Sequence, residues 1–254
     1  MHILLTNDDG IGAPGLVAIY KRLTGLGKIT VAAPSDVQSG TGHAISLTGV
    51  RCERVNVGGL FEGYIVDGSP ADCVKLALNE LIDPNDPIDF VVSGMNCGAN
   101  VGIDVFYSGT VAAAIEAAFY NLPAIAVSAA FDEPMDFEAA ADYAFEVIEQ
   151  LMDLPTGRVA NLNIPQLSKG TPKEVCITPQ STRGFDEQYL IRTDETGQKI
   201  YQLTGSSHHD PADGDWTDTT ALLAGHITLT CLRQELTDHE GNRLMSQKQF
   251  RRKQ

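Results

Sequence analysis

Long apolar runs are missing from this sequence, and their absence limits the classes of protein it can belong to. No hydrophobic stretch reaches the length needed to cross a bilayer, and no charged segment precedes an apolar one at the start. We therefore expect neither a membrane protein nor a secretory leader. Internal repeats are missing as well.

Closely spaced cysteines are also missing. The five cysteines are an odd number with no CxxC pair, at Cys52, Cys73, Cys97, Cys176 and Cys231. This distribution fits reduced thiols better than a disulfide framework or a zinc site. We therefore expect a cytoplasmic protein.

Positive charge is scarce. The chain has 18 Lys and Arg against 33 Asp and Glu, which gives a net charge of −15. Long nucleic acids need a basic surface and are not expected as partners, whereas a small phosphorylated ligand is compatible with this charge. The short basic run at residues 249–254 is interpreted as a solvated tail.

The order of strand and helix patterns predicts an α/β fold. With 254 residues, 43% of them apolar, the chain can bury one large core. Strand and helix patterns alternate through the first two thirds, as in a mostly parallel sheet. Residues 44–57 are expected to form small strands in an antiparallel excursion. Other strands are expected at 3–5, 29–33, 62–66, 89–93, 123–128, 159–164 and 175–178, and helices at 14–23, 70–81, 111–120 and 137–152.

The composition changes after Gln180. Gly, Asp, Thr and Ser dominate residues 181–220, and helix signals are poor there. We place a boundary near residue 180, between a catalytic core (1–180) and a C-terminal extension (181–254). A short helix and a strand are expected within 221–232, where the chain returns to the core.

Two adjacent carboxylates mark the opening stretch, MHILLTNDDGIGAPG. Asp8 and Asp9 follow a short apolar strand and precede a helix that begins near Pro14. Adjacent carboxylates repel each other unless a cation lies between them, and carboxylate oxygens suit Mg, Mn or Ca. A solvated turn is the alternative. A dinucleotide-binding loop built on Gly10, Gly12 and Gly15 is less favoured, because the carboxylates would face a pyrophosphate of like charge.

Polar loops follow several predicted strands and are expected to meet at one edge of the sheet. Besides the aspartates, these loops carry Ser39, Gly40, Asn96 and Asn100. Together their side chains would give an all-oxygen shell of the kind that a hard cation prefers. The helix that begins near Ser108-Gly109-Thr110 would offer free N–H groups and the positive end of its dipole to a phosphate.

Basic side chains are missing from these same segments, which strengthens this interpretation. No Lys or Arg precedes Lys21, and none lies between Lys75 and Arg158. A phosphate bound here would depend on a metal ion, backbone N–H groups and the helix dipole. This combination indicates a metal-dependent phosphoesterase, in which a carboxylate takes a proton from the attacking water.

Several of these residues have a plainer explanation that the sequence leaves open. Asn96 can stabilise its own turn, and Ser108 or Thr110 can act only as a helix cap. His43 is expected to be an ordinary loop histidine with a hydrogen-bond partner. The polar segment with His208, His209, Asp210 and Asp213 is interpreted as a solvated loop rather than a metal site.

Taken together, these blocks resemble the SurE family, the stationary-phase survival proteins. The matching segments are ILLTNDDGIGAPGL, VAAPSDVQSGTGHAIS and DFVVSGMNCGANVGIDVFYSGTVAAAIEAAFYNLPAIAVS. A weaker match runs to about residue 232, where His226, Thr228 and Cys231 replace the usual Tyr, Ser and Pro. These departures lie outside the expected metal site.

The resemblance implies a metal-dependent 5′/3′-nucleotidase that acts on nucleoside monophosphates. It implies one divalent ion (Mn, Mg or Co) per subunit, held by Asp8, Asp9, Ser39 and Asn96. The phosphate side of the pocket would be lined by Gly40, Asn96, Asn100, Ser108, Gly109 and Thr110. Asp8 and Asp9 would be the catalytic residues, and Asp9 is the preferred candidate for orienting or deprotonating the water. Direct attack by an aspartate stays open.

The family fold is a Rossmann-like three-layer α/β core. Its C-terminal extension is exchanged between subunits of a homodimer or homotetramer. Two other functions remain as alternatives. One is a non-catalytic nucleotide sensor that uses the same pocket, and the other is a glycosyltransferase-like domain that takes a sugar nucleotide.

Overall fold

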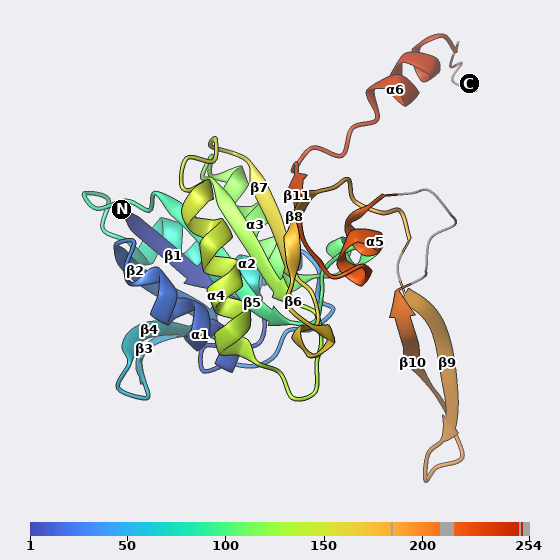
Figure 1. The fold of residues 1–254 in the computed structure, drawn as a ribbon, viewed down its shortest axis with the longest axis horizontal. Helices are drawn as coiled ribbons and strands as arrows, with labels where there is room; N and C mark the ends of the chain where they lie inside the picture. The colour runs from blue at the N-terminus through green and yellow to red at the C-terminus, as the bar shows by residue number, and fades with distance from the viewer. Residues whose placement is uncertain (184, 209–215, 249, 251–254) are drawn as a thin grey trace.

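A nine-stranded sheet forms the centre of the molecule (Figure 1). The computed structural model describes residues 1–183, 185–208, 216–248 and 250. The strand order is β3-β4-β2-β1-β5-β6-β7-β11-β8. The strands are β1 (His2–Thr6), β2 (Lys28–Pro34), β3 (Cys52–Val57), β4 (Phe61–Val66), β5 (Phe90–Cys97), β6 (Ala124–Ala129), β7 (Val159–Ile164), β8 (Lys173–Ile177) and β11 (His226–Leu232).

Most strand pairs in this sheet are parallel. Only the β3–β4 and β7–β11 pairs run antiparallel. The central strands β1, β5, β6 and β7 are buried along almost their whole length, as expected for a parallel sheet covered on both faces. The predicted α/β fold with a mostly parallel sheet is confirmed.

Helices cover both faces of the sheet, so the three-layer prediction is also confirmed (Figure 1). Helices α1 (Pro14–Leu23) and α4 (Phe137–Ile148) pack into one core cluster, and α2 (Pro70–Leu76) and α3 (Gly109–Phe119) into the other. Helix α2 continues into a single π turn (Ala77–Leu81). Short 3₁₀ turns follow at Gly102–Phe106, Glu149–Leu151 and Leu167–Lys169.

Residues 44–51 differ from the sequence prediction, because the strand begins only at Cys52. Ser69 Oγ donates to the carbonyl of Ala44 (2.7 Å), and Ser46 donates through both N and Oγ to the carboxylate of Asp72 (3.0 and 2.7 Å). These bonds hold the segment against the start of α2 instead of a neighbouring strand. The expected antiparallel excursion is therefore limited to β3 and β4.

The C-terminal third adds elements that the sequence did not predict. Strands β9 (Phe185–Thr193) and β10 (Lys199–His208) form a hairpin that stands away from the body, and α6 (His239–Ser246) also lies outside it (Figure 1). The predicted short helix and strand are confirmed as α5 (Asp218–Leu223) and β11. Strand β11 inserts between β7 and β8, so the chain returns to the main sheet.

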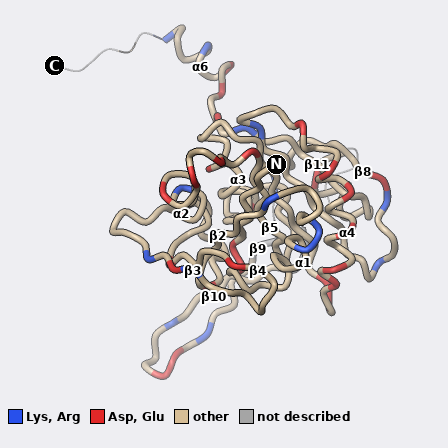
Figure 2. Tube along the Cα trace, turned by 90° about the vertical axis from the view of Figure 1, so that its left-hand side faces the viewer, with Lys and Arg blue, Asp and Glu red and all other residues tan. Residues whose placement is uncertain are grey.

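The positions of the basic residues and the hydropathy of the helices agree with what the composition predicts. In the part of the chain that is described, Lys and Arg are spread over the molecule rather than gathered on one face (Figure 2). Among the same residues, no helix has the length and apolar character required to cross a membrane.

Candidate active site

The two aspartates lie at the topological switch point of the sheet, beside β1. Strand β1 pairs with β2 on one side and with β5 on the other, and Asp8 and Asp9 follow its carboxyl end. In open α/β sheets this position forms the ligand-binding crevice. Asp8 is buried and Asp9 is half-buried.

Hydrogen bonds bring the predicted loops to these carboxylates. The N–H of Gln38, which precedes Ser39, donates to the carbonyl of Asp8 (2.7 Å). The N–H of Cys97, which follows Asn96, donates to Asp9 Oδ2 (3.2 Å). The loops that were expected to converge at one edge of the sheet therefore meet at Asp8 and Asp9.

The start of α3 is the third segment at this site. Thr110 donates to the Asp8 carboxylate through Oγ1 (2.6 Å) and through its backbone N–H (3.2 Å). A Cβ on Gly109 would lie 2.9 Å from Asp8 Cβ and 3.0 Å from Pro70 Cγ. Glycine at position 109 thus lets the helix approach the aspartate closely enough for both bonds.

Ser108 and Thr110 have different roles in the structure. Ser108 caps α3, because its Oγ accepts from the N–H of Val111 (3.1 Å), whereas Thr110 binds Asp8. Two first-turn N–H groups, those of Thr110 and Val111, are thus already used within the protein. The expectation that these N–H groups are free for a phosphate is wrong for these two, because one donates to Asp8 and the other to the Ser108 cap.

Ser39 and Gly40 lie in an exposed loop between two anchors. One anchor is the bond from Gln38 to Asp8, and the other is the N–H of Gly42, which donates to the carbonyl of Tyr107 (2.9 Å). Gly40 adopts a φ of +70°, a conformation that favours glycine. The loop is therefore fixed beside both Asp8 and the start of α3.

The two asparagines have different surroundings. The Asn96 amide N–H donates to the carbonyl of Gly98 (2.7 Å), so Asn96 does stabilise its own turn while its Oδ1 remains as an acceptor. Asn100 is buried, and its amide N–H donates to Ser128 Oγ (2.8 Å). Its backbone N–H also donates to Asn163 Oδ1 (2.8 Å), so Asn100 links its loop to β6 and β7.

Burial and like charge shift the titration of the aspartates. Desolvation, together with the neighbouring charge of Asp9, raises the pKa of Asp8 from 3.8 to about 6, against the opposing hydrogen bonds from Thr110. Desolvation also raises the pKa of Asp9. Neither shift has a positively charged side chain among its causes. The pair is therefore a concentration of negative charge without a balancing cation from the described chain.

This environment fits a hard divalent ion. The loops that meet here carry carboxylate, hydroxyl and amide oxygens, which suit Mn²⁺ or Mg²⁺ rather than a soft metal. A cation would also counteract the desolvation and the repulsion from Asp9 that raise the pKa of Asp8.

The raised pKa of Asp8 predicts an unusual pH dependence for the metal-free protein. A carboxyl group whose pKa is higher in the folded state binds protons more readily when folded, so stability falls as pH rises from 3.8 to about 6. A pKa shift of this size lowers the free energy of unfolding of the metal-free protein by up to roughly 3 kcal/mol above pH 6. Binding of an ion at this pH would restore the lost stability. We expect Mn²⁺ to raise the Tm more at pH 7.5 than at pH 5.

The matched variant for this measurement is Asp9→Asn. It removes one charge but keeps an oxygen that accepts from the N–H of Cys97. We expect a metal-free Asp9→Asn protein to be more stable than the metal-free wild type at pH 7.5, by about 1 kcal/mol, and to gain little from Mn²⁺. Equal Mn²⁺-induced shifts at both pH values in the wild type would contradict this account of the site.

One supporting group was missed from the sequence. Glu116 is buried on α3, and its carboxylate lies 2.7 Å from His43 Nε2 and 2.7 Å from Lys75 Nζ. It ties the loop after Ser39 to α2 and α3, and it gives His43 the partner that was expected. The available signal was a single charge inside the apolar segment VAAAIEAAFY. His209, Asp210 and Asp213 lie outside the described residues, as does the His208 side chain.

The fold and the site define a doubly wound α/β protein with an acidic ligand site at the switch point of its sheet. The family model described as "Survival protein SurE" matches residues 3–187. The chain belongs to the SurE family.

Similar proteins cover nearly the whole chain. A protein named 5′-nucleotidase SurE from Rhodopirellula baltica is 42% identical over 240 residues, covering 93% of this chain and 94% of the relative. Another of the same name from Syntrophobacter fumaroxidans is 42% identical, with 94% and 96% coverage. The crystal structure of the SurE protein from Aquifex aeolicus superposes with a TM-score of 0.82 at 31% identity, covering 97% of this chain and 99% of that chain.

Proposed function

We propose that this chain is a metal-dependent phosphomonoesterase that releases phosphate from nucleoside 5′- and 3′-monophosphates. The observation that carries the proposal is the uncompensated pair Asp8 and Asp9 at the switch point, where three polar loops converge. The relatives named 5′-nucleotidase SurE support the substrate class.

In this proposal Asp8, Asp9, Ser39 and Asn96 hold one Mn²⁺, Mg²⁺ or Co²⁺ ion. When bound, the ion supplies Lewis-acid polarisation of a phosphoryl oxygen. Thr110 orients Asp8 through its two hydrogen bonds, which also favour the ionised form of the carboxylate. Asp9 is less buried and orients the attacking water or takes its proton.

A cleft beside the Asn96 loop offers room for the nucleoside. Its volume is about 580 Å³, and Gly98 and Ala99 are among its lining residues. Phe131 presents an exposed ring, while Lys169 and Lys173 are the basic side chains in its lining. Gly40, Asn96, Ser108, Gly109 and Thr110 would face the phosphate, with Asn100 supporting the loop from beneath.

The test is phosphate release from a panel of nucleoside 5′- and 3′-monophosphates in Mn²⁺, with a sugar phosphate as the control substrate. We expect turnover of the nucleotides and little turnover of the sugar phosphate. Tight nucleotide binding by calorimetry without release would indicate a sensor instead. Hydrolysis or transfer from a sugar nucleotide, with no response to monophosphates, would indicate the glycosyltransferase-like alternative.

We also propose that the chain forms a homodimer or homotetramer through its C-terminal extension (181–254). The β9–β10 hairpin exposes large apolar side chains along its length, namely Tyr189, Leu190, Ile191, Ile200, Tyr201 and Leu203. A hairpin standing away from the body with this composition needs a second surface to cover it. A second copy that exchanges the same element satisfies that need.

Charging the hairpin is therefore expected to separate the subunits. The double variant Tyr201→Asp/Leu203→Asp places two charges on β10, and we expect its mass in solution to fall to that of one chain. The matched control is Glu195→Lys in the exposed turn, which should leave the mass unchanged. Light scattering after gel filtration gives the mass, and a wild-type protein that is already monomeric would contradict the oligomer proposal.

A cytoplasmic location completes the proposal. All five cysteines are free thiols, in agreement with the reducing compartment expected from their spacing.

A further inference from the structure

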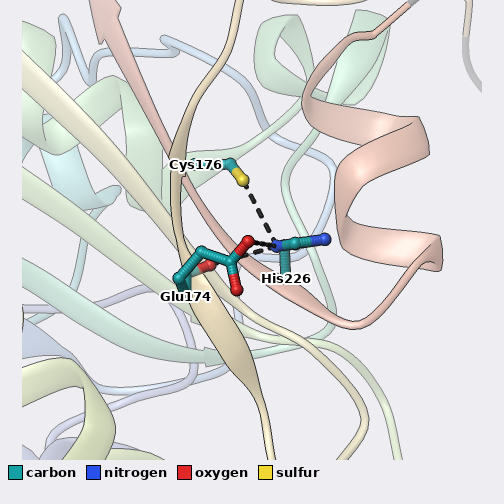
Figure 3. Close-up of side chains that lie close together, drawn as sticks. All are labelled: Glu174, Cys176 and His226. Carbon is teal, nitrogen blue, oxygen red and sulfur yellow. Dashed lines mark hydrogen bonds and ion pairs between the residues drawn. The ribbon is translucent and has the colours of Figure 1, made fainter.

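A second group of potential metal ligands lies on the outer edge of the sheet, away from the two aspartates. Glu174 and Cys176 are two residues apart on the edge strand β8, so their side chains share one face. His226 begins the neighbouring strand β11. Figure 3 shows the three side chains pointing toward one another.

A local irregularity in the β8–β11 pairing accompanies this arrangement. His226 pairs with Lys173 but Ile227 pairs with Val175, so Glu174 is the extra residue at a register shift. Bulges of this kind redirect side chains and are frequent beside functional sites. The shift brings His226 within reach of both Glu174 and Cys176.

The distances suit a tetrahedral ion. His226 Nδ1 lies 3.3 Å from Cys176 Sγ and 3.7 Å from Glu174 Oε1, and one ligand atom of each residue lies within 4.8 Å of the others. Tetrahedral Zn²⁺ with bonds of about 2.3 Å to sulfur and 2.0–2.1 Å to nitrogen and oxygen sets its ligands roughly 3.3–3.6 Å apart. The two distances from His226 Nδ1 are close to these values, and the third lies within 4.8 Å, so side-chain adjustments would complete the three bonds.

The donor set separates this group from the site at Asp8 and Asp9. A thiolate, an imidazole and a carboxylate select borderline metals such as Zn²⁺ or Co²⁺, whereas oxygen donors select Mg²⁺ or Mn²⁺. We propose that Glu174, Cys176 and His226 form a second site, which binds Zn²⁺ or Co²⁺ and leaves a fourth position for water or an added ligand.

Binding changes the protonation of two side chains. Without an ion, His226 Nδ1 lies 3.2 Å from the carbonyl of Glu174, a distance that suits an N–H donor. Coordination through Nδ1 requires the proton on Nε2 instead, so this hydrogen bond is lost. The Cys176 thiol also releases its proton, so about one proton leaves for each ion bound near neutral pH.

The site carries its own optical probe. Trp216 is the only tryptophan of the chain, and its ring packs edge-on against His226 with centroids 5.4 Å apart. Paramagnetic Co²⁺ at His226 would quench this fluorescence. Thiolate coordination of Co²⁺ would add a near-ultraviolet charge-transfer band, which an all-oxygen site cannot give.

The experiment is a Co²⁺ titration of the full chain, followed by absorbance and by Trp216 fluorescence. With Mn²⁺ present to occupy the site at Asp8 and Asp9, we expect one equivalent of Co²⁺ to produce the charge-transfer band and to quench Trp216. Zn²⁺ should reverse both, since Zn²⁺ binds more tightly than Co²⁺. Cys176→Ser should abolish the band and His226→Gln should abolish the quenching. Cys231→Ser, an exposed thiol on β11, is the matched control and should change neither.

Two results would overturn the proposal. One is the absence of a band at saturating Co²⁺. The other is a band that survives Cys176→Ser but disappears in Cys97→Ser, because Cys97 lies beside Asp9 and the signal would then belong to that site. Far-ultraviolet circular dichroism establishes that each variant is folded, and Mn²⁺-dependent phosphate release is expected to be unchanged in Cys176→Ser, His226→Gln and Cys231→Ser.

Discussion

Asp8→Asn and Asp9→Asn are each expected to lower kcat/KM for a nucleoside monophosphate by about 10²-fold or more, with the fold intact. Each change removes a charge and an oxygen donor from the proposed metal site. Even partners that only orient metal ligands are worth 10–100-fold in affinity or activity, so loss of a direct ligand should cost at least as much. Phosphate release at saturating Mn²⁺ gives the rates.

The two variants are also expected to differ in their response to metal. Asp8 is buried and accepts both Thr110 bonds, so its replacement should weaken Mn²⁺ binding and remain inactive at high Mn²⁺. Asp9 is more exposed and is the proposed partner of the water, so its loss should lower kcat as well as Mn²⁺ affinity. Near wild-type turnover in either folded variant would remove that residue from the mechanism.

Gly109→Ala is expected to have the second-largest effect. The added Cβ would lie 2.9 Å from Asp8 Cβ and 3.1 Å from Asp8 Oδ2, so the start of α3 must move away from the aspartate. Overpacking of this kind costs roughly 1–3 kcal/mol of stability. Misplacement of a catalytic group by about 1 Å can cost 10²-fold in rate, so we expect kcat/KM to fall by about 10-fold or more.

Gly12→Ala is the matched control for this change. Gly12 lies in the loop after β1 that carries Asp8 and Asp9, and it has no neighbouring atom within 4 Å of the position that its Cβ would take. Chemical denaturation and phosphate release should therefore show Gly12→Ala close to the wild type and Gly109→Ala impaired in both. If both variants have the same stability and the same kcat/KM, the close approach of α3 to Asp8 does not contribute to function.

The convergence of the polar loops at Asp8 and Asp9 was easier to predict from the sequence than the C-terminal third, for a physical reason. Asp8 and Asp9 follow a buried parallel strand, and parallel strands present their carboxyl ends at one edge, so local patterns were enough to gather the loops. Ser108 and Thr110 were both possible caps from their position before a helix, and Ser108 is the one that caps it.

Contacts between distant segments could not be predicted in this way. Residues 44–51 read as a strand by alternation, but Asp72 and Ser69 hold the segment by side-chain bonds. Glu116 meets His43 across 73 positions, and Cys176 meets His226 across 50. The hydrophobic periodicity of a sequence does not indicate which distant residues pair with each other.

The β9–β10 hairpin was missed for another reason. Its strands place Tyr189, Leu190 and Ile191 in succession, so polar and apolar residues do not alternate. Alternation is the signal of a strand with one buried face, and among the described side chains of this hairpin the large apolar ones are exposed. A second copy of the chain that covers the hairpin would explain its exposed apolar side chains.

The most direct test of the proposed chemistry is phosphate release from a nucleoside 5′-monophosphate by protein stripped with EDTA and then titrated with Mn²⁺. We expect no turnover in EDTA and a return of activity that saturates at one Mn²⁺ per chain, in the Cys176→Ser variant as well as in the wild type. Undiminished turnover in EDTA, with no metal retained by elemental analysis, would contradict a metal site at Asp8 and Asp9.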